Sequence, residues 1–375
     1  MMSKTVTETV RRLWYGQRHT TREKMLLLPL VPLSLLYRFV VFLRRLLFDR
    51  GFFKQHKTAV AVISVGNLTV GGTGKTPMVI MLAKHLQAKG YRPAVLSRGY
   101  GSKATSPVNI VSDGEKILMD GAEAGDEPVL IAISAKGVPV LTGAERIVTA
   151  ATAVERLSAD VLILDDGFQH RQIARNIDIV LLDSANPFGN GFLFPAGPLR
   201  EPLNALKRAD MIVVTDSFDD AGQMPRSIPG IPPGMPLFRA TRRPRGLRRG
   251  GTDQPVPLDH LQGARICAFS GIGAPDSFRQ TLTRLGADVV RFLSFPDHHC
   301  YDMEDLARIQ KESARAETSV IVTTEKDGVH LEAFPFFLEK VLLLGIAMEI
   351  VSGAEVFEQS ILKELKSCVS SARES

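Results

Sequence analysis

The chain of 375 residues is too long for one ordinary domain, and its 45% hydrophobic and 23% charged residues predict a globular protein with large cores. The net charge of +6 is concentrated in residues 1–57, which contain 12 Lys or Arg and only 3 acidic residues, while the remainder is slightly acidic. This distribution argues against nucleic-acid binding by the whole surface and favours a segment that meets anionic lipid. The 3 cysteines share no short spacing, so no disulfide framework or zinc motif is predicted, which suits a reducing compartment.

Residues 25–48 form a strongly apolar stretch that is flanked by aromatic and basic residues. The apolar run before Arg38 has only 13 residues, which is short for a membrane span, and Pro29 and Pro32 are expected to break or kink a helix. A secretory signal peptide and a buried core helix are the rival interpretations, but no small-residue cleavage site follows the stretch. We expect residues 1–57 to be a basic hydrophobic membrane anchor, and both a full span and an interfacial helix remain open.

Residues 60–77 combine a β-branched run, a glycine-rich turn and the start of a helical pattern. These are the parts of a phosphate-binding P-loop, in which backbone N–H groups and a helix N-terminus converge on phosphate oxygens. Lys75 would reach the β- and γ-phosphates, and the Thr76 hydroxyl would bind Mg²⁺. The general pattern has glycine where this chain has Thr69, and the rival interpretation is a glycine-rich connection with a chance Lys-Thr. The predicted nucleotide-binding residues are Thr69, Val70, Gly71, Gly72, Thr73, Gly74, Lys75 and Thr76.

Apolar strand patterns alternate with helical patterns along most of the chain. This alternation predicts an α/β protein with a P-loop parallel sheet and helices on both of its faces. We assign residues 58–220 to this P-loop domain and residues 221–260, which are rich in Pro and Arg, to a linker with an extended piece near residues 237–239. Residues 261–375 predict a smaller α/β domain whose final amphipathic helix can pack back on the first domain.

Two acidic motifs in the first domain could serve a nucleotide site. A wholly apolar strand ends in Asp165-Asp166, which is typical of a Walker-B element that holds Mg²⁺ beside the P-loop; the rival is a strand with an Asp-Gly turn. Asp126 and Glu127 precede Pro128, which predicts a loop, and could act as base and metal ligand. Taken alone, this second pair is more typical of solvated surface acids.

Other candidates follow predicted strands or lie in rigid loops. Arg98 and Arg200 offer positive charge for phosphate or for the transition state. His298-His299-Cys300 follows a strand in the second domain, where a histidine could reach across a cleft; zinc is disfavoured because adjacent residues rarely ligate one tetrahedral ion. Lys326 and Asp327 are adjacent and so do not match the guanine-reading spacing, which favours ATP over GTP.

Several motifs follow one another from about residue 60 to 331: SVGNLTVGGTGKTP, SRGYG, GDEP, LDDGFQHR, NPFGNGFLFPAGPLREP, FSGIGAPDSF, FPDHHCY and TTEKDGVHL. This combination, in this order, resembles the tetraacyldisaccharide 4′-kinases of lipid A biosynthesis. The family's own loop pattern accommodates Thr69. The resemblance implies Asp126 as the acidic catalytic residue, His298 as its partner, and Thr76, Glu127 and Asp165 as Mg²⁺ ligands. Because two histidines adjoin, the choice of His298 over His299 stays open.

The resemblance also implies the reaction and its setting. The γ-phosphate of ATP would pass to the 4′-hydroxyl of a tetraacyldisaccharide 1-phosphate, giving lipid IV-A, at the cytoplasmic face of an inner membrane. Lys75 and Arg200 complete the expected catalytic set, with ATP and Mg²⁺ as cofactors and no nucleic acid or obligatory protein partner. The alternatives are a membrane-attached NTPase with a regulatory or chaperone role and a nucleotide-sensing scaffold without turnover.

Overall fold

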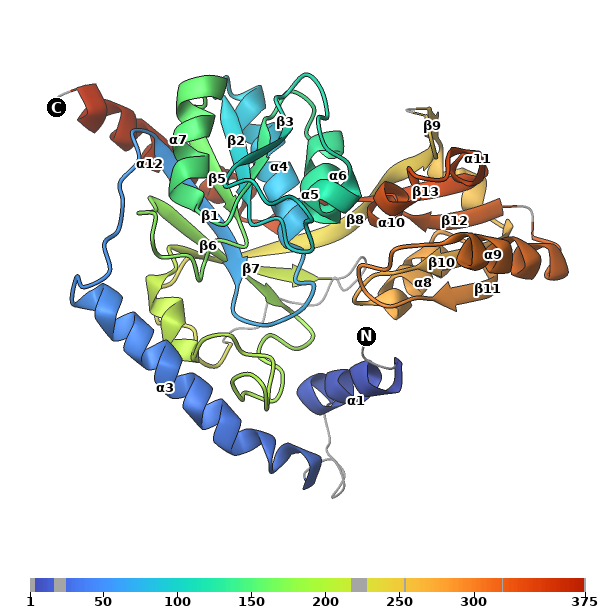
Figure 1. Cartoon of the computed structure of the whole chain (residues 1–375), viewed down its shortest axis with the longest axis horizontal. Helices are drawn as coiled ribbons and strands as arrows, with labels where there is room; N and C mark the ends of the chain where they lie inside the picture. The colour runs from blue at the N-terminus through green and yellow to red at the C-terminus, as the bar shows by residue number, and fades with distance from the viewer. Residues whose placement is uncertain (1–3, 17–24, 217–227, 253, 319, 374–375) are drawn as a thin grey trace.

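A 13-stranded sheet runs through the whole molecule (Figure 1). The computed structural model describes residues 4–16, 25–216, 228–252, 254–318 and 320–373. The strand order is β11-β10-β12-β13-β8-β7-β6-β1-β5-β2-β4-β3, and β9 pairs with β8. The predicted α/β class with a large central sheet is confirmed, and a single sheet continues through both predicted α/β units.

The N-terminal half of the sheet is centred on β1 (Ala61–Asn67), which pairs in parallel with β5 (Val161–Asp165) and β6 (Ile177–Asp183). Alternate side chains of β1 enter two different cores because successive strand residues point to opposite faces. Helices α4 and α6 cover one face and α7 covers the other. The remaining elements are β2 (Pro93–Ser97), β3 (Asn109–Ser112), β4 (Val140–Thr142), β7 (Met211–Asp216), α4 (Lys75–Ala88), α5 (Gly121–Ala124), α6 (Asp126–Ser134), α7 (Arg146–Leu157) and the 3₁₀ helix η1 (Leu203–Arg208).

The C-terminal half repeats this arrangement on a smaller scale. Its parallel strands are β11, β10, β12 and β13, and helices lie on both faces. Alternate residues of β10 again divide between the two cores, with Phe269 on one face and Ala268 on the other. The elements are β10 (Arg265–Ser270), α8 (Pro275–Arg284), β11 (Asp288–Ser294), α9 (Met303–Arg315), β12 (Val320–Thr324), α10 (Glu325–Leu331), α11 (Pro335–Leu338) and β13 (Val341–Ser352).

Two long strands join the halves. β8 (Leu237–Arg249) pairs in parallel with β7 through its first residues and antiparallel with β13 along most of its length. Much of the segment that composition assigned to a linker is therefore a strand within the sheet, followed by β9 (Pro255–Val256) and the 3₁₀ helix η2 (Leu258–Leu261). The final helix, α12 (Ala354–Arg373), returns to the N-terminal half, where Phe357, Ile361 and Leu365 enter the core beside α4.

Two helices precede the sheet, α1 (Lys4–Tyr15) and α3 (Leu30–Asp49). Pro29 interrupts the helical segment as expected, because residues 25–27 are helical, residues 28–29 form a turn and α3 begins at Leu30. Pro32 lies within α3 without a break, because the first turn of a helix leaves its N–H groups unbonded and tolerates proline there. Most apolar side chains of α3 are exposed, among them Leu33, Leu35, Leu36, Phe39, Val40, Phe42 and Leu43. Among the described residues, no helix has the length and apolar character that crossing a membrane requires.

Candidate active site

The turn between β1 and α4 has the backbone of a phosphate-binding loop. Gly71 and Gly74 have φ values of 129° and 86°, in the region that side-chain-bearing residues rarely adopt, and Gly74 caps the N-terminus of α4. Asn67 fixes the loop from inside, because its Nδ2 donates to Thr73 Oγ1 at 3.1 Å and its Oδ1 accepts from Lys75 Nζ at 3.3 Å. The loop thus surrounds Lys75 with backbone groups at a helix N-terminus.

Thr69 has a structural role in the same loop. It is buried and forms a β-bridge with Leu199, which belongs to the loop that carries Arg200. The position where the general pattern has glycine is therefore the point at which two site-forming loops are joined.

The Walker-B carboxylates lie beside Lys75, as predicted, but they differ in environment. Asp166 lies 3.6 Å from Lys75 Nζ and accepts a hydrogen bond from Arg200 at 2.7 Å. Burial acts to raise the pKa of Asp166, but the charges of Lys75 and Arg200 outweigh it and the pKa is lowered. Asp166 therefore lies between Arg200 and the P-loop lysine and contacts both.

Asp165 is the better candidate for a metal ligand. It is buried, one oxygen accepts from Ser97 Oγ at 3.2 Å, and the other, Oδ1, is buried without a hydrogen-bond partner. Burial, followed by the charges of Glu127 and Asp166, raises the pKa of Asp165 to about 7. A divalent cation would satisfy the orphaned oxygen and reverse this shift, so the donor set fits Mg²⁺.

The three proposed Mg²⁺ ligands do not form a complete metal site by themselves. Within the described part of the chain, no group of three or more His, Cys, Asp or Glu side chains is arranged to hold a metal ion. Thr76 is buried at the start of α4, and Glu127 lies in the first turn of α6 near enough to act on the pKa of Asp165. The assignment of Thr76, Glu127 and Asp165 to Mg²⁺ stays a prediction.

Asp126 is the centre of the second cluster, at the contact between the two halves. It is only 3% exposed and begins α6, whereas its motif predicted a loop; Pro128 is tolerated there because it lies in the first turn. Three cationic or potentially cationic side chains of the C-terminal half surround its carboxylate. Oδ2 lies 2.9 Å from His298 Nδ1, 3.4 Å from Lys326 Nζ and 3.5 Å from His330 Nε2.

These neighbours control the protonation of the cluster. Burial alone would raise the pKa of Asp126, but the hydrogen bond from His298, the nearby imidazole of His330 and the charge of Lys326 hold this pKa far below the ordinary carboxyl value. The same hydrogen bond raises the pKa of His298, against the opposing effect of burial. The ionised carboxylate of Asp126 therefore favours the protonated form of the His298 imidazole.

The structure also separates the two adjacent histidines. His298 has φ of 56°, and this turn directs its ring to Asp126, whereas His299 bonds Asp305 at 2.7 Å and stacks on Phe295. His299 thus belongs to the packing of the C-terminal half. Cys300 is exposed and takes no part in either arrangement.

Several site residues were not assigned a role from the sequence. Asn67 and Ser97 follow or end strands and contact the P-loop and Asp165, and Arg146 is a buried cation at the start of α7 whose pKa is influenced by Asp165. Lys326 and His330 both lie in α10, with a spacing of four that places them on one helix face. This spacing of four residues is the sequence feature that could have predicted that Lys326 and His330 face the same site.

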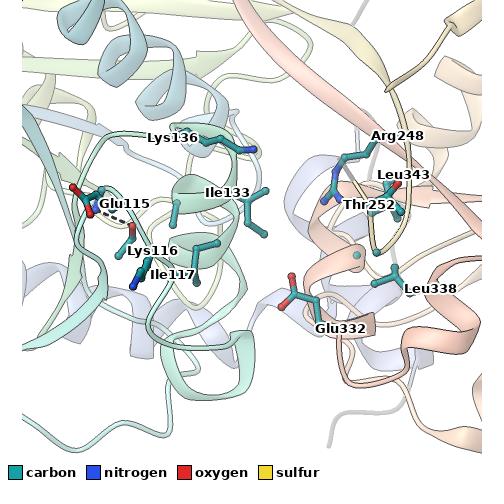
Figure 2. A pocket seen from close by; sticks show the side chains of 15 residues that line it. Glu115, Lys116, Ile117, Ile133, Lys136, Arg248, Thr252, Glu332, Leu338 and Leu343 are labelled. Atoms are coloured by element: carbon teal, nitrogen blue, oxygen red, sulfur yellow. Dashed lines mark hydrogen bonds between the residues drawn. The ribbon is translucent and has the colours of Figure 1, made fainter. Parts of the chain in front are cut away.

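A separate cleft of about 560 Å³ lies between the two halves (Figure 2). It is lined on one side by residues such as Lys116, Ile133 and Lys136 and on the other by Arg248 and Glu332. None of the predicted site residues lines it. The chemistry is therefore assigned to the P-loop and the Asp126 cluster, which have the required charges.

The fold and the two clusters define a P-loop protein of the phosphotransferase class, with a carboxylate-histidine pair at the contact between its two halves. The model of the tetraacyldisaccharide-1-P 4′-kinase family, LpxK, matches residues 26–366, and the chain belongs to this family. The chain is 48% identical to the tetraacyldisaccharide 4′-kinase of Syntrophus aciditrophicus, over 96% of this chain and 99% of the relative. It is 42% identical to the enzyme of that name from Anaeromyxobacter sp. (strain Fw109-5), over 94% and 95% of the two chains.

A solved structure is also similar over most of its length. The crystal structure described as the "apo" form of LpxK from Aquifex aeolicus in complex with ATP superposes with a TM-score of 0.75 at 36% identity, covering 91% of this chain and 99% of that one. The family resemblance that the motifs carried is confirmed.

Proposed function

We propose that this chain transfers the γ-phosphate of ATP to the 4′-hydroxyl of a tetraacyldisaccharide 1-phosphate, which forms lipid IV-A in lipid A biosynthesis. Family membership supports the activity, and the relative solved with ATP supports the nucleotide. The observation that carries the proposal in this chain is the Asp126–His298 contact of 2.9 Å, which joins the half that holds the P-loop to the C-terminal half.

Binding of the nucleotide would begin at the P-loop. Lys75, which lies 3.6 Å from Asp166, would exchange this partner for the β- and γ-phosphates, while loop amides hold the remaining oxygens. Arg200, bonded to Asp166, is available beside them to stabilise negative charge. Mg²⁺, held by Asp165, Glu127 and Thr76, would supply further charge neutralisation on the phosphates.

Asp126 would accept the proton of the acceptor hydroxyl. Its pKa is low, but phosphoryl transfer passes through a loose transition state in which the nucleophile loses its proton late, so a weak base suffices. His298 orients the carboxylate by its hydrogen bond. Because these residues come from different halves of the sheet, their contact would also exclude water, which competes with the lipid as acceptor.

The experiment is a kinase assay on the full chain in detergent with Mg-ATP and tetraacyldisaccharide 1-phosphate. Transfer is expected with the wild type and is expected to be lost in Lys75→Ala and Asp126→Asn. Full turnover of Asp126→Asn would overturn its role as base. ATP hydrolysis without lipid that equals the rate with lipid would favour the regulatory NTPase instead.

We also propose that α3 attaches the enzyme to the cytoplasmic face of the inner membrane. Its seven exposed apolar side chains are accompanied by an apolar hollow of about 600 Å³ at its C-terminal end, with Arg44, Lys54 and His56 among the lining residues. Burying one large apolar side chain contributes roughly 1.5–3 kcal/mol, and nearby bases attract anionic headgroups. This combination suits an interfacial helix.

The membrane proposal is tested by charge insertion. Phe39→Glu and Leu36→Glu, at positions that are each 60% exposed, are expected to move the protein from the membrane to the soluble fraction without unfolding it. Phe336→Glu is the matched control, because Phe336 is 84% exposed in the C-terminal half. Unchanged partition of both α3 variants would contradict the proposal.

A further inference from the structure

Helix α1, near the N-terminus in Figure 1, precedes the part of the chain that the family model matches. Specific hydrogen bonds nevertheless join it to the loop that carries Asn186, Asn190 and Pro195. The amide groups of Asn186 and Asn190 donate to the backbone carbonyls of Tyr15 and Leu13, at 3.2 and 3.1 Å. Trp14 Nε1 donates to Pro195 O at 3.1 Å. The carbonyls at a helix C-terminus need such partners, so these hydrogen bonds fix the C-terminal end of α1 against residues 186–195.

The last residue of α1 reaches the P-loop itself. The Tyr15 hydroxyl donates a hydrogen bond to Val70 O, and it lies 3.4 Å from the position that a Cβ at Gly71 would take. The N–H of Val70 donates to Pro198 O at 2.8 Å. Both backbone groups of Val70 are therefore held from outside the loop.

This bond has a consequence for the nucleotide. The carbonyl of Val70 and the N–H of Gly71 belong to one planar peptide and point in opposite directions. Gly71 and Gly72 impose little restriction on this peptide, because glycine adopts many backbone conformations. By fixing the Val70 carbonyl toward α1, the Tyr15 hydroxyl also fixes the Gly71 N–H on the opposite side of the peptide, and N–H groups of this kind are what P-loops present to phosphate.

We propose that Tyr15 is a positioning residue for ATP, which holds the Val70–Gly71 peptide in the orientation that binds phosphate. The inference rests on the proposed function, since it requires that the loop binds ATP. It assigns to α1 a part in nucleotide binding in addition to any part in membrane attachment.

The test compares two variants that each lose one hydroxyl donated to a backbone carbonyl. Tyr15→Phe removes the bond to Val70, and Ser34→Ala removes the 2.7 Å bond by which α3 holds Leu193 O, outside the P-loop. One hydrogen bond of this kind is worth about threefold to tenfold in an equilibrium constant. We expect Tyr15→Phe to raise the Kd and the KM for ATP by about this factor, with kcat and the KM for lipid within about twofold of wild type, and Ser34→Ala to change neither ATP constant.

Direct ATP titration of the full chain in detergent gives Kd, and amide hydrogen exchange of residues 66–76 without nucleotide is expected to be faster in Tyr15→Phe than in either other protein. Unchanged ATP affinity and unchanged exchange in Tyr15→Phe would overturn the inference, as would equal weakening by Ser34→Ala. If one of these contradicting results is obtained while the wild type binds ATP and phosphorylates the lipid, the role of Tyr15 is wrong and the proposed function stands. If the wild type neither binds ATP nor phosphorylates the lipid, the proposed function is wrong as well.

Discussion

Replacing Lys326 with methionine tests whether the cluster around Asp126 holds the two halves together. Lys326 Nζ lies 3.4 Å from Asp126, 3.4 Å from Glu127 and 3.6 Å from Asp297, and its side chain is 19% exposed. Burial lowers its pKa, but these carboxylates together raise it, so the lysine is charged. Lys326→Met keeps most of the apolar stem and leaves the three acids without their shared cation.

The magnitude follows mainly from Asp126. At an effective dielectric constant of 20, two unit charges 3.4 Å apart attract by about 5 kcal/mol, before relaxation and solvent entry. Glu127 and Asp297 are more than a third exposed, so solvent screening reduces their contributions to a small fraction of this value. Removing one partner of a buried pair typically costs about 3–5 kcal/mol, and we expect a loss in this range in the free energy of unfolding.

The loss has a defined pH window. The pKa of Asp126 is lowered, so its stabilising contribution is present above the ordinary carboxyl value and is lost as the pH falls through the lowered pKa. The pKa of Lys326 is raised, so its contribution is present below the ordinary lysine value and is lost as the pH rises through the raised pKa. The difference between wild type and Lys326→Met should therefore be full between about pH 5 and pH 10.

The assay is urea unfolding followed by circular dichroism at pH 7 in detergent. Lys326→Arg keeps the charge and should recover part of the loss, while Lys340→Met, at an exposed lysine of the same half, should change stability by less than about 0.5 kcal/mol. In the double variant Lys326→Met with Asp126→Asn, we expect a coupling energy of about 1–3 kcal/mol. A loss below about 1 kcal/mol in Lys326→Met, with no coupling to Asp126, would refute the reasoning.

Three further predictions concern the proposed chemistry. His298→Asn should lower kcat by about 10²–10⁴-fold, whereas His299→Asn, which loses only its bond to Asp305, should retain most activity; equal loss in both would contradict the assignment. The pKa of His298 is raised, so the stabilisation from its contact with Asp126 is present below the ordinary histidine pKa and is lost as the pH rises through the raised pKa. The difference in thermal midpoint between wild type and His298→Asn should therefore narrow above about pH 7. Removal of Mg²⁺ with EDTA should stop phosphate transfer reversibly, and transfer that persists in EDTA would exclude the metal assignment of Asp165.

The sequence predicted the nucleotide half of the fold because the relevant signals are local. The strand, the glycines and Lys75 are contiguous, and the apolar strand before Asp165 places its carboxylate at the same edge of a parallel sheet. The Asp126–His298 pair is a different case. These residues are 172 positions apart and lie in different halves of the sheet, so no local pattern relates them, and only the resemblance to the family brought them together.

From its composition, the segment 221–260 was predicted to be a linker with an extended piece near residues 237–239, whereas the structure has a strand over residues 237–249. Proline and clustered arginines are unusual in a central strand, but here Pro244 lies at a register shift in the pairing of β8 with β13, where a missing N–H is tolerated. The arginines are neutralised by acids of other elements, as in Arg239 with Asp216 and Arg245 with Glu325. These partners belong to other elements, so the strand's own residues predicted only its extended beginning near residues 237–239 and not its full length.

The loop that carries Arg200 links the proposed membrane helix to the phosphate site. Tyr37, on α3, donates its hydroxyl to Arg200 O at 3.0 Å, and the guanidinium of the same residue bonds Asp166 at 2.7 Å. Asp166 in turn lies 3.6 Å from Lys75. If α3 lies in the membrane interface, as we propose, the residues that handle phosphate are held at a fixed depth relative to the lipid headgroups, because each contact in this series is direct. An acceptor that stays in the membrane would then meet ATP without leaving its bilayer, which is the physical requirement for phosphorylating a sugar that carries four acyl chains.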